Sequence, residues 1–240
     1  MLQLIDNMQG NHLWYLVGLI TADGCLYKDG RHIEITSKEY AFLVTIKSEL
    51  GFKNKIGIKY SGIKKRYYRI QLANKRFYNF LLSVGLMPRK SLIISKIQVP
   101  QAYFNDFLRG VIDGDGSIKC WIHPSNKKEQ MGLCITSASS AFIAWLNECI
   151  CDLYSVKGRI HKECTGNWLL KYGKMAAREI LRQCYYKGCL GLERKIIKAQ
   201  QVVTSYRGWE TSKLIHIGEI KYDTAEVMKL ANMTDLKSVG

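Results

Sequence analysis

The sequence lacks the segments that would send a protein out of the cell or hold it in a membrane. No apolar run approaches the roughly 20 residues that a membrane-spanning helix needs. The N-terminal Met-Leu-Gln-Leu-Ile-Asp has neither the basic start nor the small-residue cleavage site of a signal peptide. We therefore expect an intracellular protein, in the cytoplasm or nucleoid, or in an organelle matrix if the host is eukaryotic.

Paired cysteine motifs are also missing, although the chain has eight cysteines. No Cys-x-x-Cys occurs, so the usual spacing of zinc and redox sites is absent. The nearest approach to a ligand cluster is made by Cys149 and Cys151 and by His161 and Cys164. Reduced intracellular thiols are the expected state.

Acidic residues are scarce, since 36 Lys and Arg stand against 20 Asp and Glu and give a net charge of +16. The excess lies in the first 200 residues, and residues 53–76 contain nine basic side chains, three tyrosines and no acid. Such a surplus favours a polyanionic partner, with nucleic acid first and an anionic membrane surface second. The basic residues fall on predicted strands rather than on one amphipathic helix, which favours nucleic acid.

The chain contains an internal repeat. Leu16-Val-Gly-Leu-Ile-Thr-Ala-Asp-Gly24 returns as Leu108-Arg-Gly-Val-Ile-Asp-Gly-Asp-Gly116, at an offset of 92 residues. Ile-Thr-Ser at 35–37 returns at 135–137, and Arg-Lys at 89–90 returns at 194–195. The offset grows slowly along the chain, as a duplicated domain with varying loops would show.

Each copy is predicted to read helix, hairpin, helix, hairpin, helix, which makes the fold class α+β with two pseudo-symmetric α-β-β-α-β-β-α halves. We place the halves at residues 1–98 and 99–200, followed by a helical extension at 201–240. In the first copy we expect a helix over 13–20 capped by Asn11, strands at 25–28 and 31–36, a helix from a Thr36-x-x-Glu39 capping box to Gly51, a hairpin turning at Ser61-Gly62, and a helix from Asn74 to Gly85. In the second copy we expect a helix over 101–114, strands at 117–122 and 131–136, a helix over 139–153, a hairpin turning at Thr165-Gly166, and a helix over 174–187.

Small residues four apart mark the first helix of each copy, namely Gly18 with Ala22 and Gly110 with Gly114. Glycine inside a helix costs about 1 kcal/mol relative to alanine, so its repetition at one register needs a reason. Small residues at this spacing allow two helix backbones to approach closely. We therefore expect these two helices to pack on each other about a pseudo-twofold axis.

Each of these helices ends in an aspartate, Asp23 or Asp115, where the helix dipole is already negative. Two such carboxylates brought together repel each other, and a hard divalent cation between them would relieve the repulsion. The carbonyl groups of Ala22 and Gly114 are candidate additional ligands. A cation held there polarises a phosphate oxygen and generates a hydroxide nucleophile, which is chemistry for phosphodiester hydrolysis. Asp113 has no acidic counterpart, and we interpret it as a local cap or a solvent-facing residue.

The two nine-residue segments resemble the LAGLIDADG homing endonuclease family in its single-chain, two-motif form. The first matches seven of the nine letters and the second matches six. The resemblance implies that motif helices pack at the centre, that antiparallel β-saddles lie in the DNA major groove, and that Asp23 and Asp115 bind Mg²⁺, with Ca²⁺ or Mn²⁺ as substitutes. By position it also maps family polar residues onto Ser37 and Ser137, and catalytic lysines onto Lys90 and Lys195.

Alternation along the strands separates core-facing from outward-facing residues, and the outward ones are the candidate DNA contacts. Because they differ between the halves, a monomer is expected to read a long asymmetric site in double-stranded DNA. Trp121 is compatible with the core as well. The candidate contacts are Tyr27, His32, Glu34, Lys59, Lys65, Tyr67, Arg69, Gln71, Lys119, Trp121, His123, Arg159, His161, Asn167 and Lys171.

The leading hypothesis is an intron-encoded homing endonuclease, a hydrolase that makes a Mg²⁺-dependent double-strand cut for intron homing. An RNA-splicing maturase with host intron RNA as partner, or a non-catalytic DNA-binding regulator, is the alternative on the same fold. An intein-embedded nuclease is less favoured, since the chain shows no splicing-type Cys start or His-Asn end.

Overall fold

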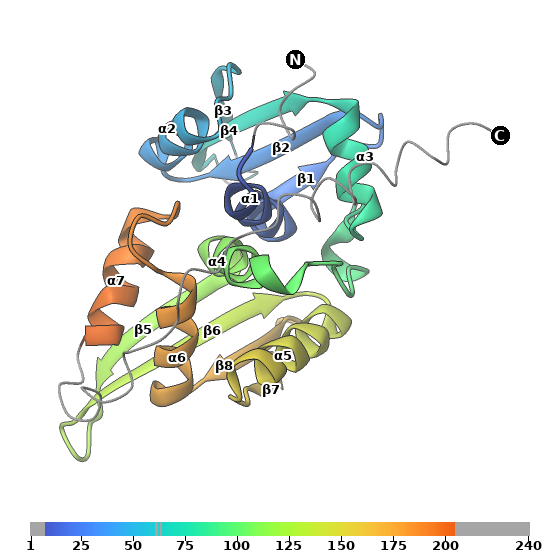
Figure 1. Ribbon diagram of the computed structural model, residues 1–240. Coiled ribbons are helices and arrows are strands. Elements are labelled where there is room, and N and C mark those ends of the chain that lie inside the picture. The colour runs from blue at the N-terminus through green and yellow to red at the C-terminus, as the bar shows by residue number, and fades with distance from the viewer. Residues whose placement is uncertain (1–7, 61, 63, 205–240) are drawn as a thin grey trace.

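The computed structural model describes residues 8–60, 62 and 64–204. The chain folds into two four-stranded antiparallel sheets with helices packed on them (Figure 1). The first sheet has the strand order β1-β2-β4-β3 and the second has the order β5-β6-β8-β7. The elements in chain order are α1 (Gly10–Asp23), β1 (Gly24–Leu26), β2 (His32–Ser37), α2 (Tyr40–Glu49), β3 (Ile56–Tyr60), β4 (Arg66–Ala73), α3 (Lys75–Ser83), the 3₁₀ turns η1 (Lys90–Leu92) and η2 (Gln101–Tyr103), α4 (Phe104–Asp115), β5 (Gly116–Ile122), β6 (Glu129–Ser137), α5 (Ser140–Tyr154), β7 (Arg159–Lys162), β8 (Trp168–Tyr172), α6 (Lys174–Cys184) and α7 (Glu193–Thr204).

The two sheets repeat one another in register as well as in strand order. Gly24 pairs with Ile35 in the first sheet, and Gly116 pairs with Ile135 at the matching place in the second. The predicted α+β fold with two pseudo-symmetric halves is therefore confirmed. The division of the chain at 98/99 and at 200/201 stays a prediction, and most of the proposed extension, residues 205–240, lies outside the described residues.

Helices α1 and α4 lie side by side at the centre of the molecule, between the two sheets (Figure 1). Their apolar residues form the middle of one continuous core, in which Leu16, Ile20, Leu108 and Ile112 are each fully buried. This placement explains why α1 is apolar nearly all round, since a helix enclosed by other elements has no solvent-exposed face that would need polar residues. The core therefore joins both halves through the two motif helices.

One face of each sheet packs on this core, as strand alternation predicts. Ile33 and Ile35 of β2 are fully buried, and so is Ile135 of β6. In the first sheet Ile35 is paired with the buried Ile70 of β4, so the apolar side chains line up across neighbouring strands. The opposite faces of both sheets are left to polar residues, which places the candidate DNA contacts there.

Two predicted helix starts are wrong, and one is confirmed. Helix α1 begins before Asn11, with Gln9 as its N-cap, so Asn11 lies inside the first turn. Helix α2 begins only at Tyr40 with Glu39 as N-cap and no side-chain cap, because Thr36 is still part of β2. Asn74 does cap α3, where its Oδ1 accepts a hydrogen bond of 2.9 Å from the Phe77 amide.

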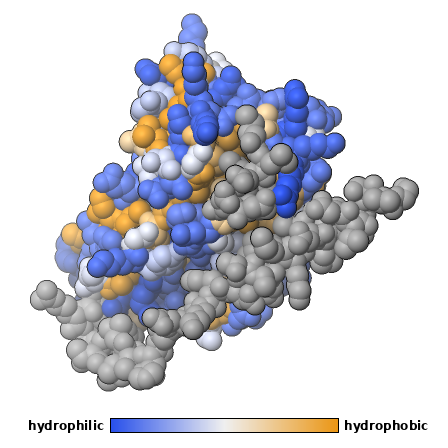
Figure 2. All heavy atoms as spheres, turned by 45° about the horizontal axis from the view of Figure 1, so that its top comes forward, coloured by the Kyte–Doolittle hydropathy of each residue, from blue (hydrophilic) through white to orange (hydrophobic). Residues whose placement is uncertain are grey.

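No helix within the described part of the chain is long and apolar enough to cross a membrane. Figure 2 shows that hydrophilic side chains cover much of one face, with apolar patches between them. Single exposed apolar residues such as Leu92 and Ile122 are ordinary on a protein surface.

Candidate metal centre and nucleic-acid interface

The contact between α1 and α4 depends on glycine at two positions. A Cβ added to Gly18 would lie 2.0 Å from the carbonyl oxygen of Phe107, and one added to Gly110 would lie 2.2 Å from that of Tyr15. Both obstacles are backbone atoms, which cannot turn aside as the end of a side chain can. The two backbones therefore touch directly, and the register of this contact determines where the two helices end relative to each other.

The ends of the two helices bring Asp23 and Asp115 into one region. A Cβ on Gly114 would lie 2.3 Å from the Cβ of Ala22 and 3.3 Å from Oδ2 of Asp23. Both aspartates are exposed to solvent, yet protein atoms crowd around them. This crowding and repulsion from Asp23 raise the pKa of Asp115 to about 6, while partial desolvation also raises the pKa of Asp23. The pair is thus open to a ligand, and its two carboxylates repel each other.

Two buried lysines lie behind the aspartates. The Lys195 ammonium donates to the carbonyl oxygens of Ile112 at 2.6 Å, Asp113 at 2.6 Å and Gly116 at 2.8 Å, and the Lys90 ammonium donates to that of Gly24. Burial lowers the pKa of Lys195 to about 8 and also lowers the pKa of Lys90. These carbonyls end the motif helices, so each ammonium neutralises the negative end of a helix dipole.

Lys195 and Lys90 also lower the pKa of both aspartates by their charge, against the effect of desolvation. The three donors of the Lys195 ammonium are matched by three carbonyl acceptors within the protein. The predicted catalytic lysines are therefore placed to act on the two carboxylates through their charge, and all three donors of the Lys195 ammonium are already bonded.

Lys38 is a further cation near the site that the sequence analysis did not select. It follows β2 directly, it lowers the pKa of Asp23 by its charge, and its ammonium lies 5.8 Å from the centre of the Tyr67 ring. The equivalent position after β6 is Ala138, so this lysine exists in one half only. A comparison of the residues that follow the two Ile-Thr-Ser segments would have revealed it.

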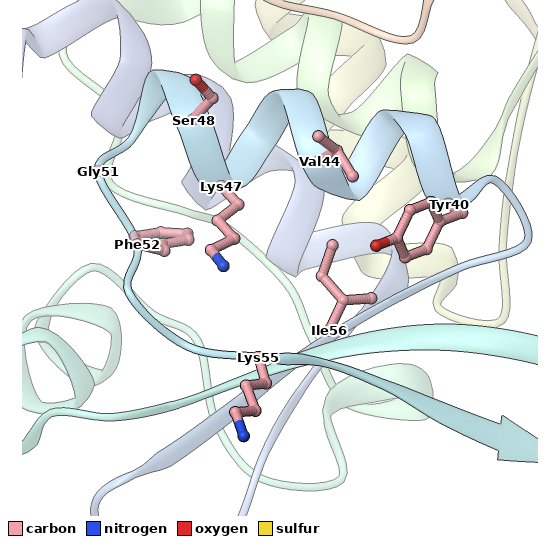
Figure 3. Close-up of a pocket in the computed structure, with 8 residues that line it drawn as sticks. All are labelled: Tyr40, Val44, Lys47, Ser48, Gly51, Phe52, Lys55 and Ile56. Atoms are coloured by element: carbon pink, nitrogen blue, oxygen red, sulfur yellow. The ribbon is translucent and has the colours of Figure 1, made fainter.

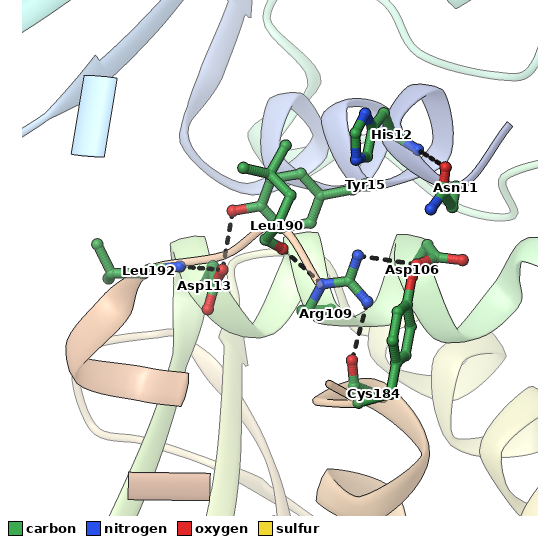
Figure 4. A network of polar contacts seen from close by, with 10 residues as sticks. Asn11, His12, Tyr15, Asp106, Arg109, Asp113, Cys184, Leu190 and Leu192 are labelled. Carbon is green, nitrogen blue, oxygen red and sulfur yellow. Dashed lines mark hydrogen bonds and ion pairs between the residues drawn. The ribbon is translucent and has the colours of Figure 1, made fainter. Parts of the chain in front are cut away.

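Asp113 is neither a cap nor solvent-facing, so that interpretation is wrong. It is 4% exposed, and its carboxylate accepts hydrogen bonds from the Tyr15 hydroxyl at 2.8 Å and the Leu192 amide at 2.8 Å (Figure 4). It also accepts one from the Tyr185 hydroxyl at 2.7 Å. Asp113 thus joins α1, α4 and the segment before α7. Its partners lie 72 or more residues away in the sequence, so local spacing could not indicate them.

A second buried polar contact lies one turn earlier on α4 (Figure 4). Arg109 is fully buried and donates to Asp106 at 2.8 Å and to the carbonyl oxygens of Cys184 at 2.8 Å and Leu190 at 2.7 Å. Its guanidinium also lies over the Tyr15 ring, 5.1 Å from the centroid. This contact fixes α4 against α1 and the end of α6, and thereby supports the placement of Asp115.

The serines that the resemblance points to serve local turns. The Ser37 hydroxyl accepts a hydrogen bond from the Glu39 amide at 3.1 Å, and the Ser137 hydroxyl accepts one from the Ser139 amide at 3.2 Å. Both therefore form the same bend between a strand and the following helix. This geometry gives each serine a structural role.

The outward face of the first sheet carries the residues that the strand alternation predicts, with one exception. Pairing of Lys59 with Tyr67 and of Gly57 with Arg69 places these side chains on the face opposite the core. The exception is Glu34, which lies on this face but is only 1% exposed, because neighbouring side chains cover it. The remaining predicted residues of this half are exposed or half-buried: Tyr27, His32, Lys65 and Gln71.

The outward face of the second sheet has a different composition. Trp121 is 47% exposed and pairs with Gln130, so it lies on the outward face and not in the core. Arg159 pairs with Lys171 and both are exposed. Lys119 and His161 are exposed on strands, whereas His123 and Asn167 lie in the hairpin loops.

Neither the cysteines nor the pocket between α2 and β3 offers a metal site among the described residues. All eight cysteines are free thiols, and among the described residues no three His, Cys, Asp or Glu side chains form a cluster that could hold a metal ion. A pocket of about 730 Å³ opens between α2 and β3 (Figure 3). It contains no aspartate, glutamate, histidine or cysteine, and its lining residues are Tyr40, Val44, Lys47, Ser48, Gly51, Phe52, Lys55 and Ile56.

Comparison with known proteins agrees with this geometry. Residues 11–85 match the family described as the LAGLIDADG-like domain. A search of curated proteins gave no match.

Solved structures share the fold across most of the chain. The homing endonuclease I-WcaI bound to its DNA recognition sequence matches with a TM-score of 0.59 at 12% identity, over 80% of this chain and 86% of that one. I-DmoI in complex with DNA and Ca matches with a TM-score of 0.52 at 18% identity, over 78% of this chain and 97% of that one. Full-length DUF199/WhiA from Thermatoga maritima matches with a TM-score of 0.53 at 18% identity, over 98% of this chain and 70% of that one. Residues 11–85 therefore match the LAGLIDADG-like domain, and the chain shares the fold of homing endonucleases such as I-WcaI and I-DmoI.

Proposed function

We propose that this protein is a site-specific DNA endonuclease that cuts both strands of a long asymmetric site, as an intron-encoded homing endonuclease does. The observation that carries the proposal is the pair of carboxylates, Asp23 and Asp115, at the ends of two helices in direct contact. A protein that only binds DNA has no need of two repelling acids at this place. The fold shared with DNA-bound homing endonucleases supports the same conclusion.

The residues present fit a divalent cation. Desolvation, and after it repulsion from Asp23, raises the pKa of Asp115, and a cation between the two carboxylates would relieve the repulsion. Asp23 and Asp115 would hold it, with the Ala22 and Gly114 carbonyl groups as candidate ligands. When bound, Mg²⁺ would supply Lewis acidity toward a phosphate oxygen and lower the pKa of a water molecule. We expect Ca²⁺ and Mn²⁺ to occupy the same site.

The chain's own residues would then place the scissile backbone. The two sheets offer outward basic side chains on both sides of the carboxylates, so duplex DNA lying on both sheets would cross the motif helices. Lys90 and Lys195 would hold the helix ends in place and add positive potential beneath the phosphates. One chain supplies both carboxylates, so a monomer suffices for two cuts.

The test is cleavage of a randomised duplex library in Mg²⁺ and recovery of the cut site, followed by binding assays in Ca²⁺. We expect a long non-palindromic site. Asp23→Asn and Asp115→Asn should each abolish cutting while the dissociation constant for the site changes less than about threefold. Asp152→Asn, at an exposed position on α5, is the matched control and should cut normally. Loss of binding together with cutting in the motif variants would contradict the assigned roles.

A DNA-binding regulator without catalysis is the second candidate, because the DUF199/WhiA protein has the same fold over nearly the whole chain. This candidate predicts sequence-selective binding with no cutting by the wild type in any divalent cation. A maturase would bind intron RNA more tightly than duplex DNA. A filter-binding comparison of the two nucleic acids distinguishes these alternatives from the nuclease.

A further inference from the structure

A buried carboxylate lies under the outward face of the first sheet. Glu34 of β2 is 1% exposed, although its side chain points to the same side as the candidate DNA contacts. An ionised carboxylate so placed faces a strongly negative ligand, and it is too well covered to touch that ligand. Glu34 must therefore act through the side chains that cover it.

Four side chains donate hydrogen bonds to Glu34. Oε1 accepts from the Lys59 ammonium at 2.7 Å and from the Thr36 hydroxyl at 3.4 Å, and Oε2 accepts from the Tyr27 hydroxyl at 2.9 Å and from Nη1 of Arg69 at 3.1 Å. The donors come from β2, β3, β4 and the residue after β1, so the carboxylate ties all four strands together at one point. The side chains of Lys59 and Arg69 remain 48% and 39% exposed.

The Arg69 guanidinium is therefore fixed on one side and open on the other. With Nη1 bound to Glu34, the edge formed by Nε and Nη2 has no acceptor among the described residues. Gly57 stands opposite Arg69 in the register, and a Cβ there would only make ordinary van der Waals contact with the Arg69 side chain, at 3.5 Å from Nε. An arginine edge of this kind forms two parallel hydrogen bonds to O6 and N7 of guanine in the major groove.

The second sheet has no such carboxylate. Ile35 and Ile135 are equivalent, since each pairs with the glycine after its motif helix, so the residue equivalent to Glu34 is Cys134. Cys134 pairs with Lys171, which is exposed and forms no ion pair with an acidic side chain among the described residues. The two sheets thus hold their basic side chains in different ways.

We propose that Glu34 is a positioning residue that orients Arg69 and Lys59 to recognise guanine in the half of the DNA site covered by the first sheet. This proposal rests on the proposed DNA-binding function and deepens it, because it replaces a predicted direct contact by an indirect one. By neutralising one charge, Glu34 also keeps these two cations from binding phosphates at any sequence. Specificity in this half then comes from orientation, whereas the second half relies on less constrained cations.

The experiment is binding-site selection from a randomised duplex library in Ca²⁺, followed by dissociation constants at several salt concentrations. For the wild type we expect one or two guanine positions in one half-site, each favoured over adenine by about fivefold or more. Glu34→Gln should reduce this preference to less than about twofold. It should also tighten binding to an unrelated duplex and make the slope of log K against log salt steeper by about one.

Two further variants separate the proposal from a general effect of charge or folding. Glu163→Gln makes the same charge change in the β7–β8 hairpin of the second sheet, and it should keep the guanine preference. Arg69→Lys keeps the charge at a half-exposed position and removes the planar fork, so it should lose the guanine preference without steepening the salt dependence.

The outcomes also separate this proposal from the proposed function. A wild type that selects a site while Glu34→Gln or Arg69→Lys retains the full guanine preference overturns the role of Glu34 and leaves DNA recognition intact. A wild type that selects no duplex sequence overturns both. A thermal unfolding curve for each variant identifies any loss that comes from unfolding.

Discussion

Lys90 and Lys195 show how one buried residue can serve both the stability and the chemistry of this fold. Each places a positive charge at the end of a motif helix where backbone carbonyls have no partner within the helix. The same charges act on Asp23 and Asp115. A substitution at either lysine should therefore change the free energy of unfolding even when no DNA is present.

We expect Lys195→Met to lower the free energy of unfolding by about 3 kcal/mol, because it removes three hydrogen bonds from a buried ammonium to backbone carbonyl groups. Lys90→Met should lower the free energy of unfolding by about 1 kcal/mol, since it removes the hydrogen bond to the Gly24 carbonyl group. Urea unfolding followed by tryptophan fluorescence measures both. Lys198→Met, exposed on α7, is the control and should stay within about 0.5 kcal/mol of the wild type. Equal effects at 195 and 198 would contradict the role given to the carbonyl contacts.

The carboxylate of Glu34 predicts a dependence of stability on pH. Burial alone would raise the pKa of Glu34, but hydrogen bonds from Lys59, Tyr27 and Arg69 outweigh it and hold the pKa below the ordinary value of 4.5. A carboxyl group with a lowered pKa in the folded state stabilises the protein above that value, and the contribution is lost as the pH falls through the folded-state pKa. The stability difference between wild type and Glu34→Gln should therefore be largest above pH 4.5 and shrink below it. Urea unfolding at several pH values checks this, and a constant difference would contradict it.

At the scale of elements, the crossing of α1 and α4 decides the geometry of the site. The glycines there permit contact between two backbones, and the buried bonds of Asp113 and Arg109 fix the helices against their neighbours. Because the aspartates follow directly at the helix ends, a small shift of one helix along the other would separate them.

Gly110→Ala is expected to lower the free energy of unfolding by about 3 kcal/mol or more. The new Cβ would meet the Tyr15 carbonyl oxygen at 2.2 Å and the Leu19 amide nitrogen at 2.6 Å, and the higher helix propensity of alanine returns only about 1 kcal/mol. Gly173→Ala is a suitable control, because nothing lies within 4 Å of its Cβ position and its φ of −76° suits alanine. Chemical denaturation of both variants measures the contrast, which would be absent if the helices did not touch.

At the scale of the molecule, two similar sheets present different surfaces to one ligand. The first sheet holds its cations around Glu34, and the second has Trp121 and a set of more exposed basic residues. The net charge of +16 attracts the protein to any DNA duplex, while the difference between the sheets determines the orientation in which the protein binds a particular site. A single chain can thus recognise a sequence that has no twofold symmetry.

Salt dependence offers a test at this scale. If the four remaining outward basic residues Lys65, Lys119, Arg159 and Lys171 contact phosphates, log K should fall with log salt with a slope of roughly −3.5. Binding to the selected site should then weaken by about two orders of magnitude between 50 and 200 mM salt. A slope near −1 in a filter-binding titration would show that the sheets do not lie along the DNA backbone.

Local pattern in the sequence determined the order of the elements and the residues of the motif. Strand alternation separates core-facing from outward-facing side chains, and the repeated glycine spacing with a terminal aspartate marks the two helices that meet. These features depend on neighbours within a few residues, so they can be read without the fold. The helix starts predicted at Asn11 and Thr36 are wrong because tertiary packing competes with local capping preferences, and the capping residues alone give no information about packing.

Only the tertiary structure decided which side chains act on one another across the chain. Asp113 accepts hydrogen bonds from tyrosines of two other segments, and Lys195 donates to the end of a helix some 80 residues earlier in the chain. Glu34 is covered by Lys59 of β3 and Arg69 of β4. Such contacts depend on how the elements pack, and packing brings together residues whose separation in the sequence carries no signal. For that reason the meeting of Asp23 and Asp115 was predictable, whereas the carbonyl contacts of Lys90 and Lys195 were not.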